Sequence, residues 1–478
     1  MPKKETVKEV KEEKSAAELL KEKLFYKNES AYDVCDEKQI DKAYKYCEGY
    51  KAFLDASKTE REAVSSAVKK LEAAGFKPFE YGRKYAAGDK FYLNNRGKAL
   101  YIVVVGKKSL EEGLSVAAAH NDSPRIDLKQ NPLYEDGGMA FFKTHYYGGI
   151  KKYQWVTIPL ALHGVIAMKD GSVIEVNIGE DERDPLFYIT DVLPHLGRDQ
   201  AGKPLGSAFT GENLNVLCGS RPFDDKKIGE KIKLNTLKLL NEKYGIVEAD
   251  FLSAELCLVP AAKARDIGFD RSMVGSYGHD DRVCAYPILS AAIDCAAKTP
   301  EYTSVTIFAD KEEIGSEGNT GMKSFAFKDM LYELAENRGE NARKMFAASK
   351  CLSADVNACF DPNYAEVYEA RNAAFINKGV VLTKFTGGGG KGDTNDAHAE
   401  YVGEVRKIFD NAGVVWQMAE LGKVDQGGGG TVAKYLADLN IDVIDLGVGV
   451  LSMHAPYEVV SKTDIYMTYQ AVKAFFYR

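Results

Sequence analysis

Two kinds of apolar spacing alternate along the chain and predict helices first and strands next. Apolar residues recur at helical spacing over 39–56 and 60–74, and Gly75 ends the second segment. Ser57 and Thr59 precede that segment as candidate N-caps. Short apolar runs then predict strands at 90–93, 99–105 and 114–119, with the hairpin-like turn 94–97 between the first two.

The amino-acid composition changes in the middle of the chain. Tyr, Thr and Gly become more frequent between about 128 and 258, and 155–168 with 173–178 predict two strands around the turn 169–172. Only 227–244 indicates a helix of useful length there. We therefore predict a strand-rich inserted domain, whose edges and apolar surface favour a symmetric homo-oligomer.

Alternating helices and strands resume near Gly268. The predicted elements are helix 281–297, strand 304–308, strand 351–355, helix 394–410, strand 414–418, a helix after Gly430, strand 442–446 and a final helix 463–476. We predict an α/β fold in which 1–127 and 268–478 form one domain, interrupted by the inserted domain 128–267. The first two dozen residues are a Lys/Glu-rich segment, helical or disordered.

Composition narrows the class of protein. A length of 478 residues suggests two or three domains, or one large domain with an insertion. The net charge of -7 argues against a nucleic-acid binder. The charged N-terminus lacks an apolar core and no stretch approaches the ~18 apolar residues of a membrane span, so we predict neither a signal peptide nor a membrane protein. None of the eight cysteines forms a Cys-x-x-Cys pair, which favours reduced thiols and a cytoplasmic location.

Five candidate metal ligands lie at the ends of predicted strands or at the starts of the following helices. The carboxyl ends of strands in open parallel sheets are where ligands collect. Imidazole and carboxylate without thiolate suit zinc, manganese or cobalt at a catalytic site. Two ions with two terminal ligands each and one shared carboxylate need five such residues, so we predict a dinuclear metallopeptidase. The five residues are His120, Asp280, Glu313, Asp355 and His454.

Two of these ligands have informative neighbours. Asp122, two residues after His120, is placed to accept a hydrogen bond from the second ring nitrogen of that histidine. On its own, this His-x-Asp pattern is equally typical of a turn before Pro124. Asp280 and Asp281 open a helix, and spacing does not decide which of them bridges two cations. We favour Asp280, because Asp281 is then free to cap the helix.

Adjacent carboxylates at Glu312 and Glu313 follow a buried strand and face different directions. One is then able to bind metal while the other takes the proton of a bound water and delivers it to a leaving amine. The alternative for the pair is a solvated acidic turn.

Two runs of four glycines, 387–390 and 427–430, allow backbone to approach a ligand closely. The first run fails the phosphate-loop spacing, because Phe385 stands where its first glycine is required. The second opens a helix, so that Gly427 and Gly428 are candidates to present N–H groups to a substrate. A flexible loop is the alternative for both.

With these residues identified, the chain resembles the aspartyl aminopeptidase and vacuolar aminopeptidase I family of dinuclear zinc exopeptidases. The resemblance implies a mixed-sheet zinc-exopeptidase domain with helices on both faces, split by a strand-rich domain, and a dodecameric assembly. The matching segments are His120-Asn-Asp-Ser-Pro-Arg, Tyr147-Gly-Gly, Asp280-Asp281-Arg282, Glu312-Glu-Ile-Gly-Ser, Ser353-Ala-Asp, Pro362-Asn-Tyr, Asp425 with its glycines, and Leu451-Ser-Met-His.

The resemblance also implies roles. His120, Asp280 and Asp355 serve one metal, and Glu313 and His454 serve the other with Asp280 shared. It makes Glu312 the general base and Asp122 the partner of His120. The family also contributes a histidine from the inserted domain of a neighbouring subunit, and His195 is the best match.

The chain departs from the family near the specificity pocket. Ala358 and Asp361 replace two usual histidines, and a glycine run follows Lys384, the residue that matches the family's substrate-binding cation. We therefore predict removal of N-terminal residues from peptides without a strong acidic preference. The rival classes are a metal-dependent deacylase or carboxypeptidase, and a non-catalytic metal-binding assembly protein.

Overall fold

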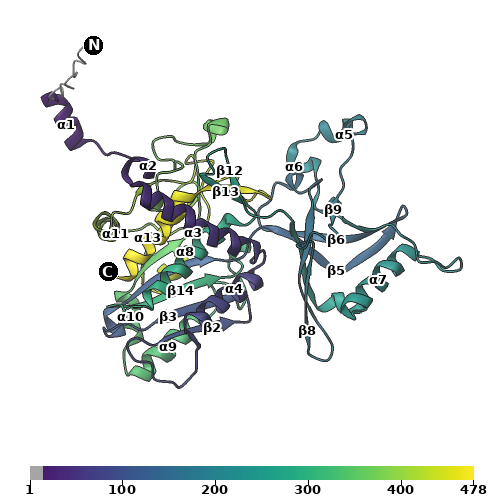
Figure 1. Ribbon diagram of the computed structural model, residues 1–478, viewed down its shortest axis with the longest axis horizontal. Coiled ribbons are helices and arrows are strands. Elements are labelled where there is room, and N and C mark those ends of the chain that lie inside the picture. The colour runs from purple at the N-terminus through teal and green to yellow at the C-terminus, as the bar shows by residue number, and fades with distance from the viewer. Residues whose placement is uncertain (1–13) are drawn as a thin grey trace, which may run out of the picture.

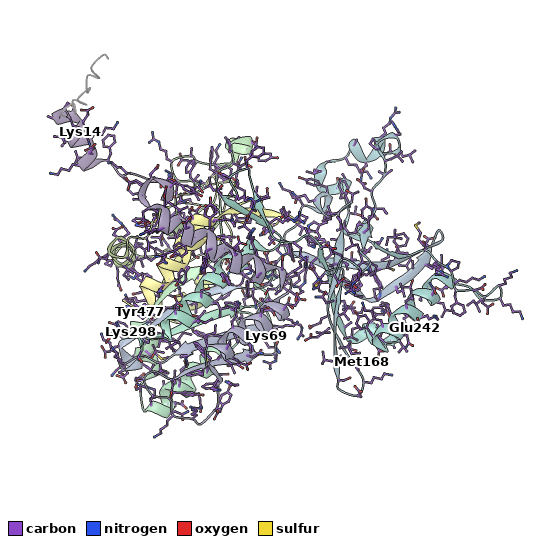
Figure 2. All side chains as sticks on the ribbon, viewed as in Figure 1. Lys14, Lys69, Met168, Glu242, Lys298 and Tyr477 are labelled. Atoms are coloured by element: carbon purple, nitrogen blue, oxygen red, sulfur yellow. The ribbon has the colours of Figure 1, made fainter. Side chains whose placement is uncertain are left out.

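The computed structural model describes residues 14–478 and has two lobes (Figure 1). Met168 and Glu242 lie on one lobe, and Lys69, Lys298 and Tyr477 on the other (Figure 2). The prediction for the charged N-terminal segment falls partly outside the described residues. Within them, helix α1 (Ala16–Leu24) begins with a capping box at Ser15, and none of its residues is buried.

The larger lobe is built on a nine-stranded mixed sheet in the order β1-β2-β3-β14-β4-β15-β19-β17-β18. Its central strands β14, β4, β15 and β19 are parallel, while β3 and β17 run antiparallel to their central neighbours. The strands are β1 (Lys77–Pro78), β2 (Lys90–Asn95), β3 (Ala99–Val104), β4 (Leu114–His120), β14 (Thr303–Ala309), β15 (Lys350–Ala354), β17 (Val380–Thr383), β18 (Trp416–Met418) and β19 (Asp442–Gly447).

Helices cover both faces of this sheet, because its central strands are apolar on both sides. In β4, Ala117 and Ala119 belong to one core and Val116 and Ala118 to the other, as the two-residue period of a strand requires. The first core includes α3 (Glu37–Asp55), α4 (Glu60–Ala73), α8 (His279–Cys295), α11 (Ala399–Ala412) and α13 (Lys462–Phe476). The second includes α9 (Ala326–Arg338), α10 (Ala342–Ala348) and α12 (Ala433–Ala437).

The smaller lobe is a seven-stranded sheet in the order β8-β7-β11-β5-β6-β10-β9, with its own apolar core. Helix α7 (Lys231–Tyr244) lies against it, and α5 (Arg198–Ala201) and α6 (Leu205–Ala208) extend from the lobe (Figure 1). The strands are β5 (Arg125–Asp136), β6 (Met139–Tyr147), β7 (Leu160–Ala167), β8 (Val173–Ile178), β9 (Tyr188–Ile189), β10 (Val216–Gly219) and β11 (Ala254–Pro260). The predicted fold class, a mixed α/β domain interrupted by a strand-rich one, is confirmed.

A third sheet of five short strands was not predicted. It has the order β12-β13-β21-β20-β16 and brings segments from distant parts of the chain to the edge of the larger lobe. The strands are β12 (Arg265–Ile267), β13 (Met273–Ser276), β16 (Asn357–Ala358), β20 (Gly449–Leu451) and β21 (Glu458–Ser461). The remaining α-helix of the described residues is α2 (Ala31–Val34).

All eight cysteines are free; six are buried, and Cys35 and Cys218 are partly exposed. Across residues 14–478, no helix combines the length and the apolar character needed to cross a membrane.

Candidate metal centre

The five predicted ligands converge at one edge of the nine-stranded sheet. His120 ends β4, Asp355 directly follows β15, and Glu313 lies in the short 3-10 helix Glu312–Ile314 after β14. Because β4, β14 and β15 are parallel neighbours, their carboxyl ends meet. Asp280 lies at the start of α8, and His454 follows β20.

Asp280 lies between the two histidines. Its Oδ1 is 3.0 Å from His120 Nε2, and its Oδ2 is 3.1 Å from His454 Nε2. Asp355 Oδ1 is 3.7 Å from His120 Nε2, and Glu313 Oε2 is 3.7 Å from His454 Nε2. One carboxylate therefore faces two groups of ligands, each with a histidine and a further carboxylate.

The donor set fits a metal. Ligand atoms of His120, Asp280 and Glu313 lie within 4.8 Å of one another, and so do those of His120, Glu312 and Asp355. Burial raises the pKa of Glu313 well above its usual range, and the Asp280 carboxylate adds to this effect. Glu313 Oε1 is buried without a hydrogen-bond partner. Buried carboxylates with unused lone pairs call for a cation, and histidine with carboxylate suits zinc.

Glu312 faces the same site as Glu313. Burial raises the pKa of Glu312 to about 8, and the Asp355 carboxylate adds to the shift. Its position beside His120 and Asp355 places a proton acceptor next to the candidate ligands.

Asp122 contacts one candidate ligand and both glutamates of the site. Its backbone carbonyl and its Oδ1 lie 3.0 and 3.2 Å from His120 Nδ1. Its carboxylate also accepts hydrogen bonds from the backbone N–H groups of Glu312 at 3.1 Å and Glu313 at 3.2 Å. Burial acts to raise the pKa of Asp122, but the His120 imidazole and the Tyr147 hydroxyl hold it below its usual value. One carboxylate thus orients the histidine and both glutamates.

The helix cap expected from Asp281 is not formed. Helix α8 has Gly278 at its N-cap position without a side-chain hydrogen bond, and Asp280 and Asp281 have non-helical dihedral angles. The Asp281 carboxylate instead accepts a hydrogen bond from His120 N at 3.1 Å. A contact between distant segments has displaced the local cap.

Two further supports for His454 were not predicted. Its Nδ1 lies 2.7 Å from the Gly149 carbonyl oxygen, which comes from the smaller lobe. The buried Glu458 accepts hydrogen bonds from His454 N at 2.7 Å and from Asp280 N at 3.2 Å. The sequence signal for Glu458 is a charged residue at the start of an apolar strand.

The Gly148 position shows how closely the two lobes approach at the site. Gly148 has a φ of +75°, and a Cβ there would lie 3.2 Å from Glu313 Oε2. Glycine is therefore needed both for the backbone conformation and for the close approach.

A cavity of about 540 Å³ opens over the candidate ligands. Gly428 lines it, whereas Gly427 does not, and the Gly427 N–H donates to the Lys423 carbonyl at 2.7 Å. Lys384 is not among the lining residues and forms an ion pair with Asp396. The apolar side chains in the wall are Val356, Leu421, Tyr435 and Met453.

His195 is not brought to this site within one chain. It lies exposed in the 3-10 helix Pro194–Leu196 of the smaller lobe and does not line the cavity.

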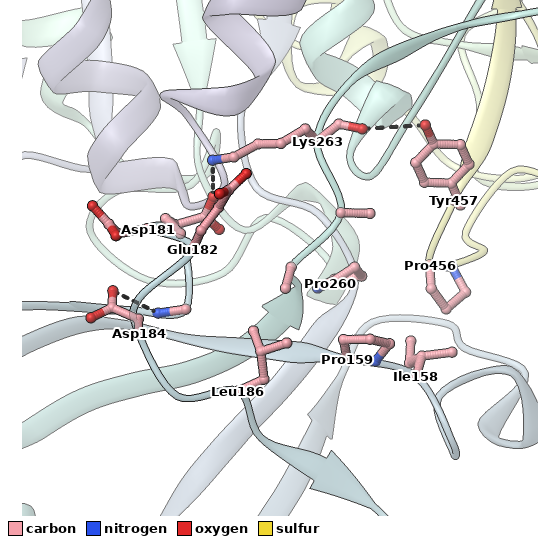
Figure 3. Close-up of a pocket in the computed structure, with 14 residues that line it drawn as sticks. Ile158, Pro159, Asp181, Glu182, Asp184, Leu186, Pro260, Lys263, Pro456 and Tyr457 are labelled. Carbon is pink, nitrogen blue, oxygen red and sulfur yellow. Dashed lines mark hydrogen bonds and ion pairs between the residues drawn. The ribbon is translucent and has the colours of Figure 1, made fainter.

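A second cavity, of about 520 Å³, lies where the two lobes meet (Figure 3). Its wall includes Glu180, which pairs with Lys263 and with Lys58 at 2.7 Å, and which lies 3.1 Å from His163 Nε2. The Glu180 carboxylate is therefore already paired with cationic side chains. Among residues 14–478, the only clusters of histidine, cysteine or carboxylate side chains close enough together to hold a metal ion are the two at the candidate centre.

Comparisons with known proteins identify the family of the chain. Residues 53–476 match the family model of the aminopeptidase I zinc metalloproteases (M18). A probable M18 family aminopeptidase 1 from Clostridium acetobutylicum is 50% identical over 466 residues, which cover 96% of this chain and 99% of that protein. An M18 family aminopeptidase structure from Thermotoga maritima has a TM-score of 0.90 at 42% identity and covers 95% of this chain and 99% of its own.

A more distant neighbour shares the fold. The Saccharomyces cerevisiae mApe1 dodecamer has a TM-score of 0.74 at 21% identity and covers 92% of this chain and 97% of its own. The predicted resemblance is confirmed. The chain belongs to the aminopeptidase I zinc metalloprotease (M18) family, and its function is that of a metallo-aminopeptidase.

Proposed function

We propose that the centre binds two divalent cations, zinc first among zinc, cobalt and manganese, and that it removes the N-terminal residue of peptides by hydrolysis. The observation that carries this proposal is the position of Asp280, whose two oxygens face His120 and His454. His120 and Asp355 would hold one ion, Glu313 and His454 the other, and Asp280 both. When bound, such ions polarise the scissile carbonyl and lower the pKa of water.

The side chains supply the rest of the reaction. Glu312 takes a proton from the attacking water and delivers it to the leaving amine. Asp122 fixes His120 and the two glutamates while this happens. Gly428, which lines the cavity, approaches the substrate backbone, and Gly427 holds the loop through its bond to Lys423. A free α-ammonium is attracted by the buried carboxylates, which favours an aminopeptidase over a carboxypeptidase or a deacylase.

The substrate preference is expected to be broad or neutral. A preference for Asp and Glu needs a fixed, unpaired cation in the pocket, but the Lys384 ammonium is paired with Asp396 and the Lys384 side chain is 40% exposed. We expect Leu- and Ala-arylamides to be hydrolysed at least as fast as Asp- and Glu-arylamides, and the N-acetylated forms to resist cleavage. Initial rates on Leu, Ala, Lys, Asp and Glu compounds, with and without acetylation, measure this.

This set of arylamide substrates tests the side-chain preference and the aminopeptidase reaction separately. Turnover confined to Asp and Glu would contradict the preference alone. Cleavage of the acetylated compounds would contradict the aminopeptidase reaction and support a deacylase.

We also propose that the chain forms a closed homo-oligomer, with twelve subunits by analogy with the yeast assembly. Large apolar side chains are exposed in the smaller lobe over a short stretch: Leu186, Leu193, Leu196 and Leu205 are 53%, 50%, 72% and 59% exposed. Such a patch marks a protein interface. His195 lies within it and would reach the cavity of a neighbouring subunit.

Light scattering should therefore show an assembly far larger than 52.7 kDa. The His195→Ala and Glu312→Gln variants should each be weakly active, and mixed assemblies should regain activity. Random mixing gives intact sites at about a quarter of the positions in a symmetric assembly. His145→Ala, an exposed histidine of the same lobe, is the control and should leave activity unchanged. An active monomer, or no gain on mixing, would rule out the role of His195 in a neighbouring site.

A further inference from the structure

Tyr147 links the smaller lobe to the carboxylate that organises the metal centre. Its hydroxyl donates to Asp122 Oδ2 at 2.8 Å. The other partners of the Asp122 side chain are His120 Nδ1 and the N–H groups of Glu312 and Glu313, all of which belong to the centre itself. Tyr147 is therefore the one hydrogen-bond partner of this carboxylate, among the described residues, that comes from outside the edge of the sheet where the candidate ligands meet.

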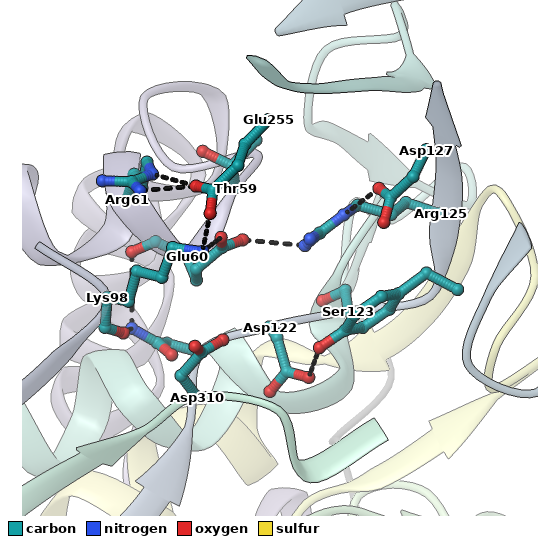
Figure 4. Close-up of polar contacts among 12 residues, drawn as sticks. Thr59, Glu60, Arg61, Lys98, Asp122, Ser123, Arg125, Asp127, Glu255 and Asp310 are labelled. Carbon is teal, nitrogen blue, oxygen red and sulfur yellow. Dashed lines mark hydrogen bonds and ion pairs between the residues drawn. The ribbon is translucent and has the colours of Figure 1, made fainter. Parts of the chain in front are cut away.

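The tyrosine ring is held by an arginine. The Arg125 guanidinium lies over the Tyr147 ring, with its carbon 4.2 Å from the ring centroid. Arg125 is itself fixed by Glu60 and Asp127, each at 2.7 Å, as the dashed lines of Figure 4 show. A cation over an aromatic face attracts the ring, and two carboxylates keep the cation in place.

These residues come from both lobes. Arg125 and Tyr147 are opposite each other in the antiparallel pair β5 and β6, the first two strands of the smaller lobe. Glu60 is the first residue of α4 in the larger lobe. Burial raises the pKa of Tyr147 well above its usual value, so the hydroxyl stays protonated and donates.

We propose that Tyr147 is a positioning residue of the metal centre, supported by Arg125, and that the smaller lobe thereby sets the geometry of His120, Glu312 and Glu313. This inference rests on the proposed function, because it assigns Asp122 to the support of a metal ligand. A buried tyrosine hydroxyl needs a hydrogen-bond partner, and many carbonyls would satisfy it. Here the partner is the Asp122 carboxylate, which contacts the His120 imidazole and the backbone N–H groups of Glu312 and Glu313.

Tyr147→Phe tests the proposal, because it removes the hydroxyl and keeps the ring under Arg125. Residues that hydrogen-bond a metal ligand directly typically contribute about 10–100-fold in metal affinity, and Tyr147 acts one contact further out, through Asp122. We therefore expect the zinc affinity of the full-length protein, measured by competition with a chromogenic chelator, to decrease by about tenfold, the lower end of that range. At saturating zinc, kcat on Leu-arylamide should fall while KM changes little. Tyr146→Phe is the matched control: Tyr146 is 40% exposed, and the zinc affinity of this variant should equal that of the wild type.

The outcomes separate this proposal from the proposed function. Wild-type protein that neither binds zinc nor cleaves arylamides would contradict the proposed function. Wild-type protein that does both, with Tyr147→Phe equal to Tyr146→Phe in zinc affinity, would contradict only the role of Tyr147. A lower melting temperature at unchanged affinity would likewise make Tyr147 a purely structural residue.

Arg125→Lys provides a second test if Tyr147→Phe does not fold. Lysine keeps the positive charge near Glu60 but loses the flat guanidinium that covers the ring. We expect a smaller loss of zinc affinity than in Tyr147→Phe, and an unchanged affinity would overturn the supporting role of Arg125.

Discussion

Replacing Glu312 with Gln should lower kcat by about 10²–10⁴-fold while leaving the fold and the zinc content unchanged. The amide has nearly the shape of the carboxylate but cannot accept the proton of the attacking water. Glu312 lies close to His120 and Asp355, so the lost acceptor is at the reacting position. Steady-state rates on Leu-arylamide at saturating zinc, with the metal content measured on the same samples, give the result.

Glu317→Gln is the matched control for that experiment. Glu317 lies on the same loop, but its side chain is 67% exposed and pairs with Lys323. Its kcat should match the wild type. A metal-replete Glu312→Gln protein with near wild-type kcat would remove Glu312 from the reaction.

Replacing Asp280 with Asn should have the second large effect, because it affects both groups of ligands. The neutral amide no longer balances two cations, and only its oxygen is a metal ligand. Loss of a residue that only hydrogen-bonds a metal ligand typically lowers metal affinity by at most about 100-fold. We expect the zinc affinity of Asp280→Asn to decrease by more than that. Zinc content after dialysis against buffered zinc should fall, and kcat/KM should fall with it.

The control for Asp280→Asn is the same substitution at Asp294, further along α8. The Asp294 side chain is 41% exposed and pairs with Lys473, away from the cavity. Asp294→Asn should keep the wild-type zinc content. An Asp280→Asn protein that retained two ions per chain and normal turnover would show that Asp280 is not the shared ligand.

The sequence predicted the central strands well, because they are buried on both faces and read as continuous apolar runs. β4 and β14 were expected at 114–119 and 304–308 and lie at Leu114–His120 and Thr303–Ala309. The candidate ligands His120, Glu313 and Asp355 come at or shortly after the ends of such runs, which is why the strand ends indicated them. The ends of the elements were harder to predict. A strand was expected from 155, but β7 begins at Leu160, because Lys152–Gln154 form a 3-10 turn before it.

The supporting contacts of the site could not be predicted in the same way. Glu458 accepts hydrogen bonds from the backbone N–H groups of His454, four residues before it, and of the distant Asp280, and no sequence spacing relates Asp280 to that segment. Asp281 illustrates the same limit, since a local rule predicted a helix cap and a contact with His120 replaced it. Local patterns predict elements and candidate ligands, whereas the residues that orient those ligands depend on which distant segments meet.

The Tyr147-Gly148-Gly149 segment has a consequence for any attempt to build a minimal enzyme from this chain. All five candidate ligands and Glu312 lie outside the strands of the smaller lobe, so a shortened chain without 125–260 would keep every candidate ligand and Glu312. It would nevertheless lose the carbonyl that faces His454 and the hydroxyl that faces Asp122. The smaller lobe is therefore not an accessory that engineering or evolution can discard at no cost to the chemistry.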